Sequence, residues 1–595
     1  MNTAKFVHNY IDKIKFFQEK LLEYLENDND EEMYFNNLSN YFNEQQFIDN
    51  KHNLKVILRL IAQISTNFHQ SNNFFNKIER IINSCKEKIQ NYYTNIDIFS
   101  IFKDNKKILY FLFKEKILIP DIQLSKIIQT KKYKKKFYCQ FFYPEFKSFY
   151  NEDLLNDTLN EHPEINEEDF EENRKFGENN SQICKLIKND SIDEFVTFST
   201  QMNLNYSSKI QNSIFETNSF LLKNEDITLI EYAAFYGSIQ IFNFLRLNNA
   251  EMRPILWLHA IHGRNADIFH LLEENRIEKP KDSFERCLQE AIKCHHNDFA
   301  NYIQENLMNN SENIVDYCFR YYNFQYLQEE EQFDEGQLFY IACHYDYYTL
   351  VDFLLTNGNV DLSEILSLFH SAAKKNSYEV INLLLTKKEE IGNKVFLSCG
   401  NLLKLSIPST ITYIGDCAFQ NCTSLVDIEI PNSINYLGSS AFAFCSSLTE
   451  ITLTSPSLSF INGTTFYKCS SLTKVTIQSP INTIHNRDFC DCISLKEIIL
   501  PSSLFEIKGN AFDGCSSLSQ LTIPPNVNYI GDSAFRGCRL LTEVTIPPSV
   551  ISVANYAFCA CPNLKKVYIN SKTSFTKKSF SYNALIIKKN DCIIF

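Results

Sequence analysis

The sequence predicts a multidomain repeat protein: an all-α N-terminal half that includes helical repeats, followed by a parallel-β solenoid. Two observations carry this prediction. Between residues 183 and 391, small residues recur within amphipathic segments, and between residues 392 and 570 a Phe and a Cys recur at a fixed interval. Each copy of a periodic pattern packs on the next copy, whereas an active site needs its residues only once. We therefore expect binding surfaces rather than catalysis.

The composition favours a soluble intracellular protein. The chain has 595 residues, enough for about three or four domains, and a formal net charge of −13, which disfavours nucleic acid as a partner. Its first twenty residues contain no uninterrupted apolar stretch, and no segment approaches the roughly 18 apolar residues of a membrane span. Nineteen Cys without a secretory signal are typical of reduced thiols. We expect a cytoplasmic location.

Residues 1–149 are predicted to form a helical domain. Ile11, Ile14, Phe17, Leu21 and Leu25 recur at spacings of three and four, the period of one buried helix face. Similar stripes follow in "LKVILRLIAQI" and "FFNKIERIINSCKEKI". The domain is therefore expected to pack its helices through apolar stripes.

Two charged segments lie near the end of this domain. Lys131 to Lys136, "KKYKKK", is a basic island that fits a nuclear-import signal or an anionic surface, although we favour a solvated helix end. Residues 150–182 contain "NEEDFEENRKFGENN" and few large apolar side chains. Such a segment cannot bury enough surface to order itself, so we predict a flexible acidic linker.

Residues 183–391 are predicted to form repeated pairs of short helices. Each unit has a small residue where the first helix presses on its neighbour, then an aliphatic stripe on the second helix. The intervals between the small residues are 27, 31, 51 and 30, and the interval of 51 leaves room for a degenerate copy around Cys318. The small residues are Ala233, Ala260, Ala291, Ala342 and Ala372.

The segment from Thr228 to Leu245 resembles the ankyrin repeat. It keeps Thr228, Ala233, Ala234 and Gly237 of the pattern T-P-L-H-x-A-A-x-x-G, while the Pro, Leu and His positions are replaced. The region is also similar to a protist domain of unknown function that carries ankyrin-like repeats. The resemblance implies divergent helical repeats without catalytic activity.

Residues 392–570 contain eight copies of one pattern, for which we predict stacked coils. Each copy has a Phe, a Cys three residues later, a Leu three residues after the Cys, and a short strand with two inward aliphatic residues. The pattern resembles the BspA-like leucine-rich repeat, which implies a parallel sheet with strands about 4.8 Å apart. Residues 571–595 are expected to cap its end. The Phe positions are spaced by 23 residues, with one interval of 24: Phe396, Phe419, Phe442, Phe466, Phe489, Phe512, Phe535 and Phe558.

The outward positions of these strands are the candidate partner-binding residues. They flank the buried aliphatic residues on the expected concave face, and most are acidic or Thr. Such a column suits a polar or basic protein partner, or is only a solvated sheet face. The candidates are Asp427, Glu429, Glu450, Thr452, Lys474, Thr476, Glu497, Gln520, Thr522, Glu543, Thr545, Lys566 and Tyr568.

The sequence predicts no metal ion, cofactor or catalytic residue. A zinc site needs four ligands at fixed short spacings, whereas the possible ligands here lie in turns of different repeats, so we interpret them as structural. The repeated Cys residues are interpreted as buried free thiols. Motifs of nucleotide-binding, zinc-protease and serine-hydrolase sites are absent from the sequence. The possible ligands are Cys287, Cys294, His295, His296, Cys343 and His344.

Two functions remain open. The first is a non-enzymatic scaffold for protein–protein interaction that uses both repeat arrays. The alternative is a cell-surface adhesin, because BspA-like repeats are associated with attachment proteins. In that case Asn421 and Asn462, which lie in N-x-T sequences, would be available as glycan acceptors.

Overall fold

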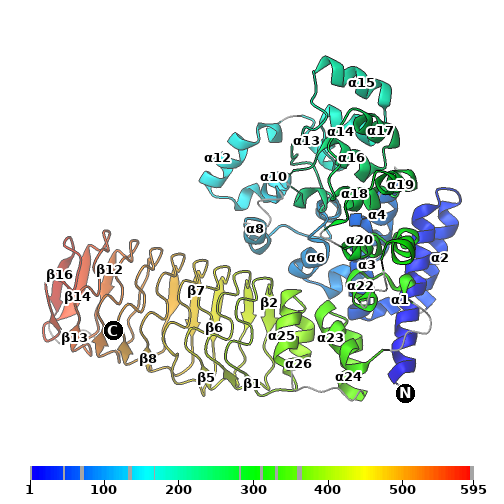
Figure 1. Ribbon diagram of the computed structural model, residues 1–595. Coiled ribbons are helices and arrows are strands. Elements are labelled where there is room, and N and C mark those ends of the chain that lie inside the picture. The colour runs from blue at the N-terminus through cyan, green and yellow to red at the C-terminus, as the bar shows by residue number, and fades with distance from the viewer. Residues whose placement is uncertain are drawn as a thin grey trace. The chain divides into compact units, whose positions relative to one another are not determined.

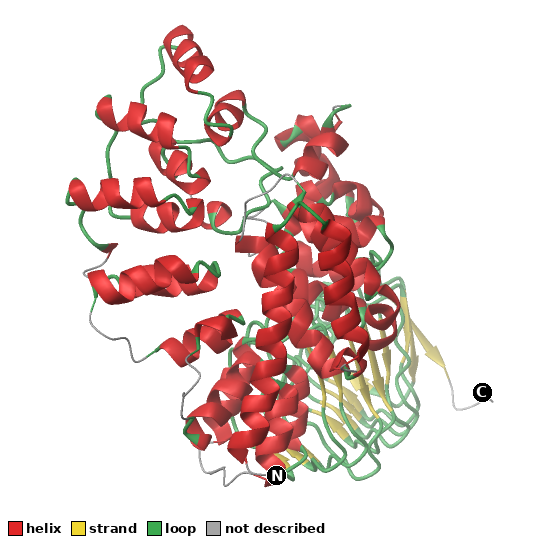
Figure 2. Cartoon of the chain, turned by 90° about the vertical axis from the view of Figure 1, so that its right-hand side faces the viewer, coloured by secondary structure: helices red, strands yellow, loops and turns green. Residues whose placement is uncertain are grey.

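The computed structural model describes residues 3–44, 47–67, 73–130, 137–166, 168–224, 226–280, 283–308, 313–327, 333–357 and 365–589. The chain divides into two units, Met1–Asp334 and Glu335–Phe595, and each is described by itself. Helices build the first unit, and a parallel-β solenoid follows the helices of the second (Figures 1 and 2). The predicted fold class is therefore confirmed. The basic segment Lys131–Lys136 lies outside the described residues.

The N-terminal helices pack against one another through buried apolar stripes, as the sequence predicts. The five apolar residues of the stripe on α1 are each at most 6% exposed. Thr94, Asn105 and Asp121 cap α6, α7 and α8, because each side chain accepts a hydrogen bond from a backbone N–H three residues later. The helices of residues 3–149 are α1 (Thr3–Glu26), α2 (Glu31–Glu44), η1 (Phe47–Asp49), α3 (Lys51–Asn67), α4 (Phe74–Ser84), α5 (Lys86–Tyr92), α6 (Asn95–Phe102), α7 (Lys106–Lys114), α8 (Ile122–Ile128), α10 (Tyr138–Phe141), α11 (Tyr143–Phe146) and η2 (Lys147–Phe149).

Residues 150–182 differ from the flexible linker that the sequence predicts. They contain α12 (Glu152–Glu161), η3 (Pro163–Asn166) and α13 (Phe170–Phe176). The fully buried Arg174 guanidinium forms ion pairs with Glu145 at 2.7 Å and Glu171 at 2.8 Å. Phe170 packs on Phe215 with ring centroids 5.6 Å apart. The ion pairs neutralise part of the acidic charge, and the Phe contact anchors the segment, which explains why it is folded.

Stacked helix pairs follow in the first unit. The first helices α14, α16, α18, α20 and α22 contact one another in this order. The degenerate repeat around Cys318 is present as α22, and its second helix is reduced to the short η7. The small residues Ala233, Ala260 and Ala291 of the other repeats are fully buried. The elements are α14 (Gln182–Lys188), α15 (Ile192–Gln201), η4 (Leu221–Lys223), α16 (Leu229–Tyr236), α17 (Ile239–Leu247), α18 (Leu256–Gly263), α19 (Ala266–Glu274), α20 (Glu285–Lys293), α21 (Asn297–Tyr302), the π-helical η6 (Ile303–Leu307), α22 (Ile314–Tyr321) and η7 (Phe324–Tyr326).

A buried amide joins α1 to the turns of this array. Gln18 Nε2 lies 2.9 Å from both His295 Nδ1 and Asn323 Oδ1, and Gln18 Oε1 accepts a hydrogen bond from the backbone N–H of Phe324. The N-terminal helices and the array from α14 to α22 therefore belong to one unit.

Two further helix pairs cap the N-terminal end of the solenoid in the second unit. They are α23 (Glu335–Tyr345) with α24 (Tyr348–Asn357), and α25 (Ile365–Lys374) with α26 (Tyr378–Leu385). Phe369 of α25 lies 5.5 Å from Phe396, and the Asn376 side chain accepts a hydrogen bond from the Leu403 N–H at 2.8 Å. The boundary between the units thus falls inside the predicted array, because its last helices pack on the first coil.

The solenoid contains two rows of parallel strands that stack side by side (Figure 1). The longer strands form the sheets β2-β4, β6-β7-β9 and β12-β14-β16, and the two-residue strands form β1-β3-β5 and β15-β13-β11-β10-β8. The longer strands are β2 (Lys404–Ser406), β4 (Asp427–Glu429), β6 (Glu450–Leu453), β7 (Lys474–Ile477), β9 (Glu497–Ile499), β12 (Glu543–Thr545), β14 (Lys566–Asn570) and β16 (Leu585–Lys589). The short strands are β1 (Glu390–Ile391), β3 (Tyr413–Ile414), β5 (Tyr436–Leu437), β8 (Thr483–Ile484), β10 (Glu506–Ile507), β11 (Tyr529–Ile530), β13 (Ser552–Val553) and β15 (Ser574–Phe575).

The Phe residues of the repeat form one ladder through the solenoid interior. From Phe396 to Phe580, neighbouring rings lie 5.0–5.6 Å apart and within 2–14° of parallel. The eight predicted positions are fully buried. Each ring therefore contacts the coil before it and the coil after it, which is how one coil stabilises the next.

The Cys residues of the repeat have a structural role in the same interior. From Cys422 to Cys561, each thiol donates to the carbonyl of the Phe in the preceding coil, at sulfur–oxygen distances of 3.0–3.7 Å. Burial raises the pKa of these thiols, to about 12 for Cys445. The eighteen cysteines of the described ranges are free. The Cys column therefore consists of protonated thiols that satisfy buried carbonyls.

Candidate functional site

The predicted partner-binding residues lie along the outward side of the longer strands, which we call the long-strand face. In β4, Ile428 is buried while Asp427 and Glu429 are exposed, and β6 and β12 alternate in the same way. All thirteen candidates are exposed or half-exposed. The period of two therefore places core and candidate residues on opposite sides of each strand.

The longer strands form three sheets rather than the predicted one, with breaks between β4 and β6 and between β9 and β12. Gln520 and Thr522 are exposed, but residues 519–523 form no strand, and Leu521 is only half-buried. As a result β9 and β12 belong to different sheets. The candidate face is interrupted at Gln520 and Thr522 rather than continuous.

Lysines alternate with carboxylates on the long-strand face. The Lys474 ammonium lies 3.7 Å from the Glu497 carboxylate, and both side chains are about half-exposed, so this ion pair contributes little to stability. The face is therefore mixed in charge, and less acidic than its Asp and Glu positions alone indicate. The parallel register places Lys404 beside Asp427, Lys474 between Glu450 and Glu497, and Lys566 beside Glu543.

Carboxylates gather at one place on this face, which we call the acidic corner. It consists of Asp427 and Glu429 on β4 and Glu450 on the adjacent β6. The pKa of Asp427 is raised, because neighbouring side chains partly desolvate its carboxylate and Glu429 repels its charge, and Lys404 offsets this only in part. A cation that approaches the corner would relieve this repulsion.

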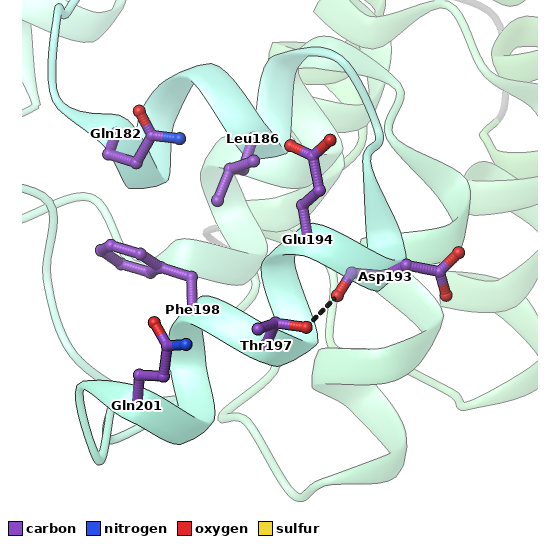
Figure 3. A pocket seen from close by; sticks show the side chains of 7 residues that line it. All are labelled: Gln182, Leu186, Asp193, Glu194, Thr197, Phe198 and Gln201. Atoms are coloured by element: carbon purple, nitrogen blue, oxygen red, sulfur yellow. Dashed lines mark hydrogen bonds between the residues drawn. The ribbon is translucent and has the colours of Figure 1, made fainter.

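The helical unit contains a shallow pocket between α14 and α15. Its volume is about 310 Å³. Figure 3 shows that Leu186 and Phe198 give it an apolar side, and that the Thr197 hydroxyl donates to the Asp193 carbonyl at 2.9 Å. That hydroxyl therefore donates within its own helix and not to a carboxylate of the pocket. The lining residues are Gln182, Leu186, Asp193, Glu194, Thr197, Phe198 and Gln201.

The structure separates most of the possible metal ligands that the sequence contains. His295 Nδ1 bonds to the Gln18 amide, and His296 Nδ1 lies 2.9 Å from the Ile261 carbonyl oxygen. Cys294 instead meets His262 and Glu290, and the ligand atoms of these three residues lie within 4.8 Å of one another.

This group is not among the ligands predicted from the sequence, although the sequence contains a signal for it. His262 and Glu290 are 28 residues apart, which is close to the repeat interval, and equivalent positions of stacked repeats are neighbours in space. Among the described residues, His262, Glu290 and Cys294 are the one group of three or more side chains with this geometry. Cys343 and His344 belong to the second unit.

The two N-x-T sequences of the solenoid differ in accessibility. Asn421 is exposed, and its amide donates to the Ser398 hydroxyl at 3.1 Å. Asn462 is half-buried, and its amide donates to the Leu437 carbonyl at 2.8 Å, within the solenoid. Asn421 is therefore the more accessible of the two amides. No helix within the described ranges has the length and apolar character needed to span a bilayer.

Comparison with known proteins concerns the solenoid. The model of the BspA type leucine rich repeat region matches residues 389–519 and 459–587. No curated protein matches the chain. A leucine-rich repeat protein from Bacteroides ovatus is 30% identical over 34% of this chain and 57% of that chain, with a TM-score of 0.30. A leucine rich cell surface protein from Faecalibacterium prausnitzii is 22% identical over 34% of this chain and 64% of that chain, with a TM-score of 0.24.

The pneumococcal vaccine antigen PcpA is also 22% identical, over 34% of this chain and 66% of that chain, with a TM-score of 0.24. This chain spans less than two thirds of the length of each of the three proteins. The repeat pattern, the two rows of parallel strands and the match of the family model cover the same residues. Residues 389–587 therefore form a BspA-type leucine-rich repeat region.

Proposed function

We propose that the protein is a non-enzymatic scaffold for protein–protein interaction and that its long-strand face binds a protein partner. One observation carries the proposal: β4, β6, β7, β9 and β12 bury one side chain in the solenoid core and leave the next exposed or half-exposed, at one register position. A face of this kind is rigid, because its backing is packed, and it offers many side chains at a regular spacing. The buried free thiols favour a reducing compartment, and we propose a cytoplasmic location.

The charges of the long-strand face indicate which kind of partner it can bind. The acidic corner of Asp427, Glu429 and Glu450 suits a basic group, whereas the lysines along the face suit acidic groups beside it. Complementary charge steers the encounter and suppresses wrong partners. We therefore propose a partner whose surface carries a basic cluster flanked by acidic residues.

Charge reversal tests this proposal. Replacing Asp427, Glu450, Glu497 and Glu543 together by Lys should abolish or weaken capture of the partner and leave the circular dichroism spectrum unchanged. The matched control replaces Glu389, Glu390, Glu506 and Asp532 by Lys, which changes the net charge equally outside the long-strand face. Affinity capture with mass spectrometry compares both variants with the wild type. The proposal fails when the folded face variant retains every partner, or when the control loses the same partners.

The helix-pair array offers a second surface within the same function. We propose that it is a divergent ankyrin-type array, supported by the stacked first helices and by Ala233, Ala260 and Ala291 at their contacts. Gly237 ends α16 in the left-handed conformation, with φ 69°, as a tight turn between paired helices requires. This array becomes the better candidate when the face variant retains its partners.

The second candidate function is a cell-surface adhesin, which the exposure of Asn421 favours. An antibody that stains intact, unpermeabilised cells would establish it. In that case Asn421→Gln should remove a glycan and increase electrophoretic mobility, whereas Asn462→Gln should not. Absence of surface staining would contradict the adhesin and favour the intracellular scaffold.

A further inference from the structure

Three potential metal ligands meet between two stacked helices of the first unit. His262 lies on α18, Glu290 lies on α20, and Cys294 directly follows α20. His262 Nε2 is 2.8 Å from a Glu290 carboxylate oxygen, and the Cys294 sulfur is 3.6 Å from His262 Nδ1 and 3.8 Å from Nε2. The imidazole and the thiol are buried. The group therefore combines one nitrogen, one oxygen and one sulfur ligand, of which the nitrogen and the sulfur are buried.

We propose that His262, Glu290 and Cys294 bind one divalent cation of the zinc type, with water as the fourth ligand. Zinc takes imidazole, carboxylate and thiolate ligands, and sites with three protein ligands keep one position for water. In a tetrahedral zinc site, ligand atoms are roughly 3.3 Å apart for nitrogen and oxygen and roughly 3.5 Å apart for nitrogen and sulfur. An ion bound to Nε2, the nitrogen that faces Glu290, involves the sulfur–nitrogen separation of 3.8 Å, which must close by about 0.3 Å. The His262–Glu290 pair, at 2.8 Å, must open by about 0.5 Å.

Two aromatic rings pack against His262 and hold its imidazole in place. Its ring lies between Phe220 at 4.2 Å and Phe235 at 5.1 Å, measured between ring centroids. These contacts fix the orientation of the imidazole. The helices α18 and α20 also contact each other directly, so an ion here would join two neighbouring repeats.

Lys293 is the competitor for this site. Its ammonium contacts the same Glu290 oxygen as His262 does, and so neutralises the carboxylate. Lys293 and Glu290 are 17% and 14% exposed, so the group opens to solvent on their side. A lysine side chain is long and flexible, and it can turn toward solvent when a cation takes its place on the carboxylate. The contact therefore predicts that removal of the ammonium strengthens cation binding.

Cobalt(II) binding to the reduced full-length chain tests the proposal. Thiolate ligation gives a charge-transfer band in the near ultraviolet, and we expect one equivalent of Co²⁺ to produce it and Zn²⁺ to displace it. Cys294→Ser should lose the band. Cys287→Ser, a change at a buried cysteine on α20, should keep it. Lys293→Met should bind Co²⁺ on the order of tenfold more tightly, because a like charge beside the site is removed.

Each outcome decides the question. The proposal is overturned when the wild type shows no thiolate band, or when the band survives Cys294→Ser. The role of Lys293 as competitor is refuted when Lys293→Met binds no more tightly than the wild type. If Cys294→Ser does not fold, the Co²⁺ affinity of Lys293→Met still tests the proposal. Circular dichroism of each variant establishes whether it is folded.

Discussion

Replacement of Phe512 by Ala is expected to lower the free energy of unfolding of the solenoid by about 4 kcal/mol. Phe512 is fully buried, and its ring stacks on Phe489 at 5.3 Å and on Phe535 at 5.1 Å. Truncation of a core Phe to Ala costs about 3–5 kcal/mol, because apolar burial is lost and a cavity remains. Each ring contact adds about 0.5–1.5 kcal/mol beyond burial, so the loss of two contacts places the expected value in the middle or upper part of that range.

The matched control is Phe505→Ala on the same coil. Its side chain is 54% exposed, so the same chemical truncation should change the free energy of unfolding by less than about 0.5 kcal/mol. Thr522→Ala, at an exposed position of the long-strand face, should have an equally small effect.

Denaturation in urea, followed by circular dichroism, measures these differences. Because the chain has two units, labelling of Cys515 and Cys538 reports on the solenoid, since both thiols are buried in the native state. Equal midpoints for Phe512→Ala and Phe505→Ala would refute the assignment of the Phe column to the core.

Three further predictions follow from buried polar groups. The repeat thiols should react with mild alkylating agents only after unfolding, because burial raises their pKa; rapid labelling in the native state, or disulfides found by mass spectrometry, would contradict this. Arg174→Met should cost about 3 kcal/mol, since it leaves Glu145 unpaired, and should expose residues 152–176 to limited proteolysis. The exposed Lys188→Met is the control, with an expected loss below about 1 kcal/mol. Burial alone would raise the pKa of Glu290, but the Lys293 ammonium and the neighbouring imidazole outweigh it and hold that pKa well below the ordinary 4.5. The folded state therefore gains stability from the carboxylate above pH 4.5 and loses it as the pH falls. In melting curves recorded at decreasing pH, Glu290→Gln should be less stable at neutral pH and less sensitive to acid than the wild type; equal acid sensitivity would contradict the ion pair.

The sequence by itself determined the interior of the solenoid. A strict interval places each Phe, Cys and Leu beside the equivalent residue of the next coil, and the period of two in each strand separates buried from exposed positions. The Phe ladder and the exposure of Asp427 and Glu429 agree with that reading. These features were predictable because the contacting residues repeat in the sequence itself.

Only the tertiary structure decided the contacts between residues that do not repeat. The pairing of Arg174 with Glu145, which folds the predicted linker, joins positions with no periodic relation. The same is true of Gln18, which meets His295 and Asn323 across more than 270 residues. Such contacts depend on how whole helices pack, and no local pattern encodes that packing.

The candidate sites show the same division. The sequence placed the outward residues of the long-strand face, but the parallel register decided that lysines stand beside the carboxylates. The meeting of His262, Glu290 and Cys294 also required the structure. Although the repeat interval brings α18 and α20 together, the ligand atoms meet only because side-chain packing in that interface turns them toward one another.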